Sequence, residues 1–92
     1  MTKRETFKEI IPVSEVRVLS RYVLELTFAN GEVRVIDIEP MMWGPAFESL
    51  LNDYLLFKKV GVDRDSGTIS WPNGADVSPV TLYEESKLAI PA

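Results

Sequence analysis

The amino-acid sequence predicts an α+β domain, an antiparallel β-meander with one or two short helices on one face of the sheet. Three observations support this fold class. Apolar and polar residues alternate over most of residues 13–38, which is typical of half-buried strands. An Asn-Gly pair interrupts that alternation where a hairpin would turn. Apolar residues at helical spacing occur only after this region, in two short segments.

The length of the chain bounds its organisation. A chain of 92 residues fits one domain and leaves no room for a second core. We therefore take residues 1–92 as a single domain, with a folded core over residues 13–88 and a flexible segment over residues 1–10. Chains of this size bury somewhat over roughly 60% of the surface that their unfolded form exposes, so the free energy of unfolding should be about 5 to 10 kcal/mol.

The first predicted strand covers residues 13–19, where Val16 and Val18 alternate with Arg17 and Leu19. A short turn leads from this strand into the hairpin. The three strands are therefore expected to form an antiparallel meander.

The hairpin over residues 23–38 turns at Asn30-Gly31. Asn-Gly favours a two-residue type I′ turn, because both central residues of that turn need positive φ. If Ala29 faces Glu32, the register of the whole hairpin follows. The pairs are then Phe28 with Val33, Leu26 with Val35 and Leu24 with Asp37. These pairs make one face of the hairpin largely apolar.

Helices and strands alternate after the hairpin. Pro40 ends the meander, because proline cannot donate to a β-ladder. A short helix is predicted over residues 46–53, after a Gly-Pro break, and its continuation over residues 54–57 fits either a helix or a strand. Two short strands follow over residues 60–63 and 68–71, joined by a turn that is rich in Asp, Ser and Gly.

The last predicted helix begins at Pro79, since proline is favoured at the first helical position. Ser78 or Asp76 can accept hydrogen bonds from the free N–H groups of the first turn. The apolar stripe of this helix consists of Leu82, Tyr83 and Leu88.

The composition excludes several classes of function. The sequence contains no cysteine and no histidine, so it has no thiol nucleophile, no Cys-based zinc site and no imidazole base. The net charge of −4 repels phosphate backbones, so we expect no direct binding of nucleic acid. Carboxylates at Asp63 and Asp65 resemble a calcium loop, but Gly74 stands where an EF-hand has its glutamate. We therefore expect no enzymatic activity, no catalytic residues, no metal site and no cofactor.

The first candidate binding segment covers residues 41–47, MMWGPAF, and joins a predicted strand to a predicted helix. A loop this apolar either folds inward as part of the core or forms an exposed contact surface for a partner. Its candidate binding residues are Met42, Trp43 and Phe47. The sequence leaves both alternatives open.

The second candidate binding segment covers residues 70–79, SWPNGADVSP. Its proline, asparagine and glycine supply turn geometry between a strand and the last helix. A helix N-terminus can also bind an anion and a tryptophan can flank a pocket, so a small-ligand site is the alternative. The candidate binding residues here are Trp71, Asn73 and Asp76.

Three stretches follow one another along the chain: YVLELTFANGEVRVIDIEP, residues 47–51, and VDRDSGTISWPNGADVSPVTLY. This succession resembles a family of short bacterial domains of unknown function, numbered twenty-four forty-two. The most specific part of the resemblance is WPNGAD with a following proline and Leu-Tyr. In that family, similar domains occur alone, fused to a helix-turn-helix domain, or beside another short protein in a gene pair suggestive of a toxin and antitoxin. The resemblance implies an α+β fold, no established enzymatic activity and a toxin-like protein as the partner.

The sequence and the resemblance together favour a non-enzymatic interaction module that binds a protein partner or a second copy of itself. The alternative is a domain that binds a small ligand or anion in a pocket near Trp71 and Asp76. No segment approaches the roughly 18 apolar residues of a membrane span, and the N-terminus lacks the apolar run of a signal peptide. We therefore expect a cytoplasmic protein that does not interact with membranes.

Overall fold

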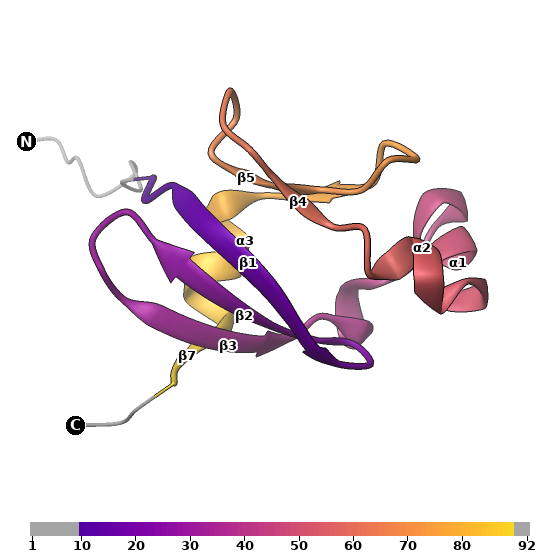
Figure 1. Cartoon of the computed structure of the whole chain (residues 1–92), viewed down its shortest axis with the longest axis horizontal. Coiled ribbons are helices and arrows are strands. Elements are labelled where there is room, and N and C mark those ends of the chain that lie inside the picture. Colours follow the sequence, from indigo (N-terminus) through magenta and orange to yellow (C-terminus); the bar gives the residue numbers. More distant parts are fainter. Residues whose placement is uncertain (1–9, 90–92) are drawn as a thin grey trace, which may run out of the picture.

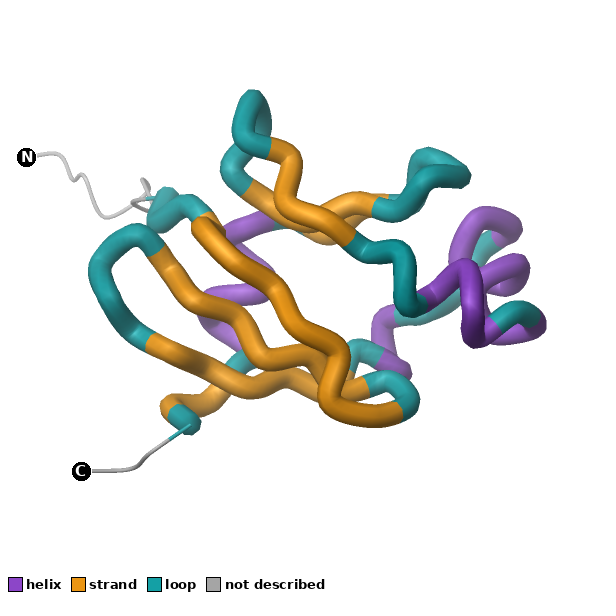
Figure 2. The backbone as a smooth tube through the Cα atoms, viewed as in Figure 1, coloured by secondary structure: helices purple, strands orange, loops and turns teal. Residues whose placement is uncertain are grey.

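Two antiparallel sheets and three α-helices make up the part of the chain that the computed structural model describes, residues 10–89 (Figures 1 and 2). This arrangement confirms the predicted α+β fold. The predicted flexible segment over residues 1–10 lies outside the described residues, apart from Ile10.

The larger sheet contains the predicted meander and one further strand. Its strands pair in the order β1-β2-β3-β7. Their bounds are Val13–Ser20 for β1, Val23–Phe28 for β2, Val33–Asp37 for β3 and Lys87–Leu88 for β7. The strand β7 was not predicted, because a two-residue strand leaves no periodicity in the sequence.

The turn between β2 and β3 differs from the predicted type I′ turn. The N–H of Phe28 donates to the carbonyl of Glu32 at 2.9 Å, and the N–H of Gly31 donates to the carbonyl of Phe28 at 2.9 Å. Gly31 has a φ of 90°, whereas no described residue other than glycine has positive φ. Asn30 therefore cannot take the first left-handed position of a type I′ turn. The turn is a three-residue loop that ends in glycine, the next most common hairpin connection.

The three-residue loop changes the register of the hairpin. Leu24 pairs with Ile36, and Leu26 pairs with Arg34. Because side chains alternate between the two faces of a strand, this shift sends the opposite set of β3 residues to the core. Ile36 and Ile38 are buried, so the observed register buries isoleucines where the predicted one would have buried valines.

The smaller sheet lies above the meander in Figure 1 and pairs in the order β4-β5-β6. The bounds of its strands are Gly61–Asp63 for β4, Thr68–Ser70 for β5 and Asp76–Val77 for β6. The strands β4 and β5 confirm the two predicted short strands. The short strand β6 was not predicted.

The last helix, α3, covers Pro79–Glu85 and begins at the predicted residue. The hydroxyl of Ser78 accepts a hydrogen bond from the N–H of Val80 at 3.2 Å, which confirms the predicted cap. The alternative cap was wrong, because Asp76 is an exposed residue of β6. Leu88 does not extend the helical stripe either, because the chain has already left the helix and entered β7.

Two short helices stand at one end of the molecule (Figure 1). The helix α1 covers Pro45–Asn52 and α2 covers Tyr54–Phe57, so the ambiguous segment is helical. A 3-10 helix, η2, over Glu39–Met41 connects β3 to them. Asp53 separates α1 from α2 and caps α2, since its carboxylate accepts a hydrogen bond from the N–H of Leu56 at 3.1 Å.

The core lies between the two sheets and α3 and extends toward α1 and α2. The aromatic side chains connect these elements: the ring of Phe28 on β2 meets that of Tyr83 on α3 edge to face at 5.0 Å. The largest fully buried side chains are Leu24, Leu26, Phe28, Ile38, Leu50, Phe57, Ile69 and Leu82.

Candidate functional site

The first candidate segment, residues 41–47, divides between core and surface. The side chain of Met42 is 5% exposed, whereas that of Trp43 is 78% exposed. The backbone causes this division: the N–H of Met42 closes the 3-10 turn on Glu39 at 3.0 Å, and Gly44 then takes a φ of 96° at the start of α1. The sequence left open whether this loop was core or exposed; in the structure Met42 belongs to the core and Trp43 lies at the surface.

The loop between β5 and β6 repeats the hydrogen bonds of the β2–β3 loop. The N–H of Trp71 donates to the carbonyl of Ala75 at 2.9 Å, and the N–H of Gly74 donates to the carbonyl of Trp71 at 2.9 Å. The side-chain oxygen of Asn73 accepts a hydrogen bond from the N–H of Ala75 at 3.1 Å. The side-chain oxygen of Asn30 accepts the equivalent bond from the N–H of Glu32 in the other loop. Both Asn-Gly pairs thus specify a three-residue loop with glycine in the left-handed region.

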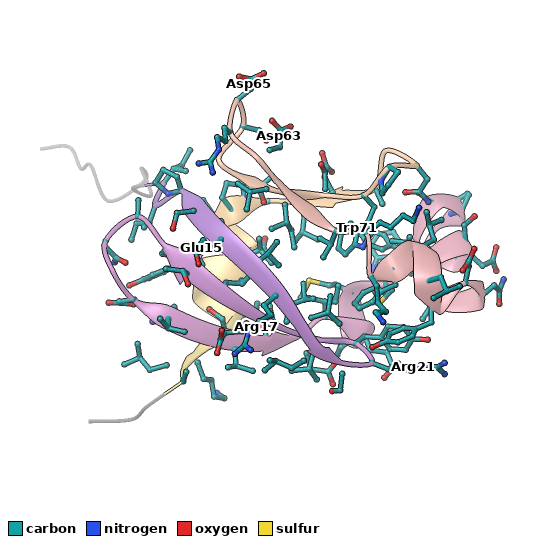
Figure 3. All side chains as sticks on the ribbon, in the orientation of Figure 1. Glu15, Arg17, Arg21, Asp63, Asp65 and Trp71 are labelled. Carbon is teal, nitrogen blue, oxygen red and sulfur yellow. The ribbon has the colours of Figure 1, made fainter. Side chains whose placement is uncertain are left out.

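Trp71 is a core anchor rather than the wall of an open pocket. Its side chain is 3% exposed, and its indole N–H donates to the carbonyl of Phe57 at 2.8 Å. The ring also packs against those of Phe47 and Phe57, with centroids 5.6 and 5.8 Å away. Figure 3 shows this side chain, just after the end of β5, on the side of the short helices. Trp71 therefore fixes the smaller sheet to α1 and α2.

The two candidate segments come together in space. The side-chain amide of Asn73 donates to the carbonyl of Ala46 at 2.9 Å, and the rings of the neighbouring residues Phe47 and Trp71 meet edge to face at 5.6 Å. The chain thereby joins two loops that lie far apart in the sequence. We call their exposed residues the loop-pair surface. It consists of Trp43, Gly44, Pro45, Pro72, Asn73 and Gly74.

Residues 13–87 match the model of a family described as "Protein of unknown function (DUF2442)". The chain belongs to this family. The match confirms the resemblance to family twenty-four forty-two, although the description of the family assigns no activity. No curated protein and no solved structure matches the chain.

The sixth candidate residue of this DUF2442 domain, Asp76, lies apart from the loop contacts. It is exposed on β6 and pairs with Ser70 of β5.

A hollow of about 500 Å³ is present elsewhere, lined by residues of β2, β3 and the end of the described chain. These are Glu25, Val33, Leu88 and Ala89, so none of the six candidate residues lines it. The small-ligand hypothesis therefore retains only Asn73 and Asp76 as accessible groups.

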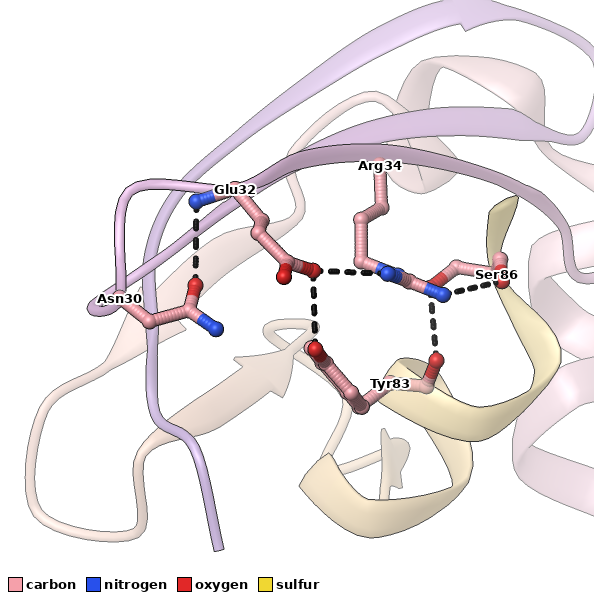
Figure 4. A network of polar contacts seen from close by, with 5 residues as sticks. All are labelled: Asn30, Glu32, Arg34, Tyr83 and Ser86. Atoms are coloured by element: carbon pink, nitrogen blue, oxygen red, sulfur yellow. Dashed lines mark hydrogen bonds and ion pairs between the residues drawn. The ribbon is translucent and has the colours of Figure 1, made fainter. Parts of the chain in front are cut away.

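A polar cluster between β3 and α3 was not foreseen from the sequence (Figure 4). Arg34 donates to the carboxylate of Glu32 at 2.7 Å and to the hydroxyl and carbonyl of Ser86, each at 2.9 Å. The guanidinium also lies 4.3 Å from the ring centroid of Tyr83. The only signal in the sequence is an arginine inside an apolar strand. This cluster fixes α3 and β7 to the sheet.

Hydrogen bonds in this cluster lower the pKa of its carboxylate. A hydrogen bond from the Tyr83 hydroxyl at 2.8 Å, followed by the one from Arg34, holds the pKa of Glu32 below its usual value. Both hydrogen bonds favour the ionised form of the carboxylate. The carboxylate is therefore an acceptor with two donors, and their effect outweighs the opposing effect of desolvation on its pKa.

Two further kinds of site bear on function in the part of the chain that the structure describes, a metal site and a membrane span. Between residues 10 and 89, no three His, Cys, Asp or Glu residues lie close enough together to hold a metal ion. In the same region, no helix has both the length and the apolar character needed to cross a membrane.

Proposed function

We propose that this DUF2442 domain is a non-enzymatic protein-interaction module of the bacterial cytoplasm, which binds a protein partner through its loop-pair surface. The exposure of Trp43 is the observation that carries this proposal. A tryptophan that is 78% exposed leaves a large apolar ring in water, although the preceding residue, Met42, is buried. Tryptophan is also the residue type most enriched among the residues that dominate binding energy at interfaces.

The rigidity of the loop-pair surface supports the same proposal. Pro45 and Pro72 fix φ at two of its positions, and the hydrogen bond from Asn73 to Ala46 joins the two loops. A surface that is already ordered loses little conformational entropy when a partner binds. Trp43 therefore stands on a preorganised base, as an anchor residue requires.

The partner that fits this surface offers an apolar pocket for the indole ring. The resemblance to the family suggests a toxin-like protein encoded in a gene pair, and a second copy of the chain is the competing occupant. The chemistry of the chain supports a binding role over catalysis, because the sequence lacks histidine and cysteine and, between residues 10 and 89, no three carboxylates lie close enough together to hold a metal ion.

A photoreactive phenylalanine analogue placed at position 43 in living cells tests the proposal. We expect a covalent product with one other protein, and no such product when the analogue replaces Leu19, an exposed apolar residue of β1. With that partner purified, the substitution Trp43→Ala should weaken binding by about 2 kcal/mol or more, roughly 30-fold.

The competing outcomes are distinct. Leu19→Ala should bind like the wild type, and both variants should keep the wild-type melting temperature. A covalent product that contains only two copies of this chain would show that the surface binds a second copy of the chain and not another protein. Unchanged partner affinity in Trp43→Ala would refute the loop-pair surface as the binding site.

A further inference from the structure

A second surface lies at the same end of the molecule, where the β1–β2 turn meets α2. We call Arg21, Lys58 and Lys59, together with the ring of Tyr54, the basic patch. Although the chain carries a net charge of −4, these cations form no ion pair within residues 10–89. The arginines of the sheet differ, because Arg17 and Arg34 each pair with a glutamate.

One aromatic ring organises the basic patch. The guanidinium of Arg21 lies 4.6 Å from the ring centroid of Tyr54, and the ammonium of Lys58 lies 5.7 Å from the same centroid. Both distances are within the range of cation–π attraction. Residues far apart in the sequence thus bring two like charges to one ring, whose attraction opposes their mutual repulsion.

The ring itself rests on the core. Tyr54 stacks on the buried ring of Phe57 at 5.9 Å and 16°, and Tyr22 meets Phe57 edge to face at 5.1 Å. The hydroxyl of Tyr22, which follows Arg21 in the chain, donates to the carbonyl of Leu51 at 3.4 Å. The basic patch therefore has a fixed base, and only its exposed charged groups are free to adjust.

Between residues 10 and 89, no acceptor takes a hydrogen bond from the side chain of Arg21, Lys58 or Lys59. Arg21 presents the face of its guanidinium to Tyr54, and its N–H groups donate no hydrogen bond to the described residues. A guanidinium in this state can bind a carboxylate in bidentate fashion, while the lysines act as compact charges beside it. The neighbouring carboxylate of Asp53 already caps α2 through Leu56. We propose that the basic patch binds an acidic segment of a protein partner.

Charge and apolar exposure favour an acidic peptide over a nucleic acid. A long polyanion would meet the repulsion of the whole chain, whereas a short acidic segment experiences mainly the local cations. Figure 3 places Arg21 well away from the acidic turn that carries Asp63 and Asp65. Leu55 of α2, 72% exposed beside Tyr54, offers an apolar contact that a peptide side chain can use.

The test uses a fluorescent oligoglutamate peptide and measures its affinity by anisotropy at low and high salt. We expect binding at low salt that weakens as salt is added, because the contacts are between exposed charges. The double substitution Arg21→Gln and Lys58→Gln should weaken binding about tenfold or more. Lys87→Gln combined with Arg64→Gln is the matched control, with the same loss of charge away from the basic patch, and should change affinity less than about twofold.

A second variant tests the organising ring. Tyr54→Leu keeps every charge and should weaken binding by a few-fold, and circular dichroism checks that it remains folded. The inference is overturned if oligoglutamate does not bind at low salt, or if the control pair weakens binding as much as the patch pair. Tighter binding of a single-stranded oligonucleotide of equal charge would overturn it in favour of nucleic acid.

The inference does not depend on the loop-pair surface. Trp43→Ala should bind oligoglutamate like the wild type, so a failure of the basic patch and a failure of the proposed function give different results.

Discussion

Replacing Trp71 by phenylalanine removes one buried hydrogen bond and keeps most of the ring contacts. The indole N–H that donates to the Phe57 carbonyl at 2.8 Å disappears, and the carbonyl is left without this donor in the core. The carbonyl keeps a longer hydrogen bond from the N–H of Val60 at 3.3 Å, so the lost bond costs about 0.5 to 1.5 kcal/mol. The smaller ring adds a further cost of about 1 kcal/mol for the space it leaves. We expect a total loss of about 1.5 to 2.5 kcal/mol from a chain whose stability is about 5 to 10 kcal/mol.

The matched control is the same substitution at the other tryptophan. Trp43→Phe changes an exposed ring with no described hydrogen bond from its indole, so it should alter stability by less than about 0.5 kcal/mol. Urea unfolding followed by circular dichroism compares the stabilities of the two variants. In a thermal melt, a loss of about 2 kcal/mol corresponds to a fall of about 8 °C or more in melting temperature. The reasoning is refuted if Trp71→Phe melts with the wild type, or if both variants lose the same amount.

Three further predictions concern the loops, the last helix and pH. Gly31→Val should lower the free energy of unfolding in urea by about 1 to 3 kcal/mol, because the position has a φ of 90°. In the control Gly61→Ala, at ordinary φ with open space around it, the free energy of unfolding should change by less than about 1 kcal/mol. Ser78→Ala should lose about 1 kcal/mol as a helix cap is removed, and Asp76→Ala should be nearly neutral; equal losses would contradict the observed cap. The lowered pKa of Glu32 means that its stabilising contribution is present above the ordinary value of 4.5 and is lost as pH falls through the folded-state pKa. The stability difference between wild type and Glu32→Gln should therefore shrink on acidification from neutral pH, and a difference that grows would contradict the assigned hydrogen bonds.

Both loops of the candidate site could be predicted from the sequence, but the way they meet in space could not. The sequence singled out both loops through their tryptophans and their turn residues, and these loops do meet. It could not distinguish Trp43 from Trp71, because each lies beside a turn with similar neighbours. The side that each ring faces depends on the backbone course of its loop and on partners such as the Phe57 carbonyl, which the chain reaches only by folding.

The basic patch and the polar cluster at Arg34 escaped prediction for a related reason. Each joins residues from separate elements: the β1–β2 turn with α2 in one case, and β3 with α3 in the other. The residues next to Arg34 and Lys58 in the sequence do not indicate which side chains these cations will contact. Pairings of this kind follow from the packing of whole elements.

The features that depend on near neighbours could be predicted from the chain alone: the strands of the meander, the short strands β4 and β5, the start of α3 and its cap at Ser78. Periodicity and capping involve residues within a few positions of each other, so the sequence contains their cause. The register of the hairpin depends on long-range packing, since the Asn-Gly pair suits both a two-residue and a three-residue loop. The larger burial of Ile36 and Ile38 favours the observed register, and that burial exists only when the second sheet and α3 cover the first.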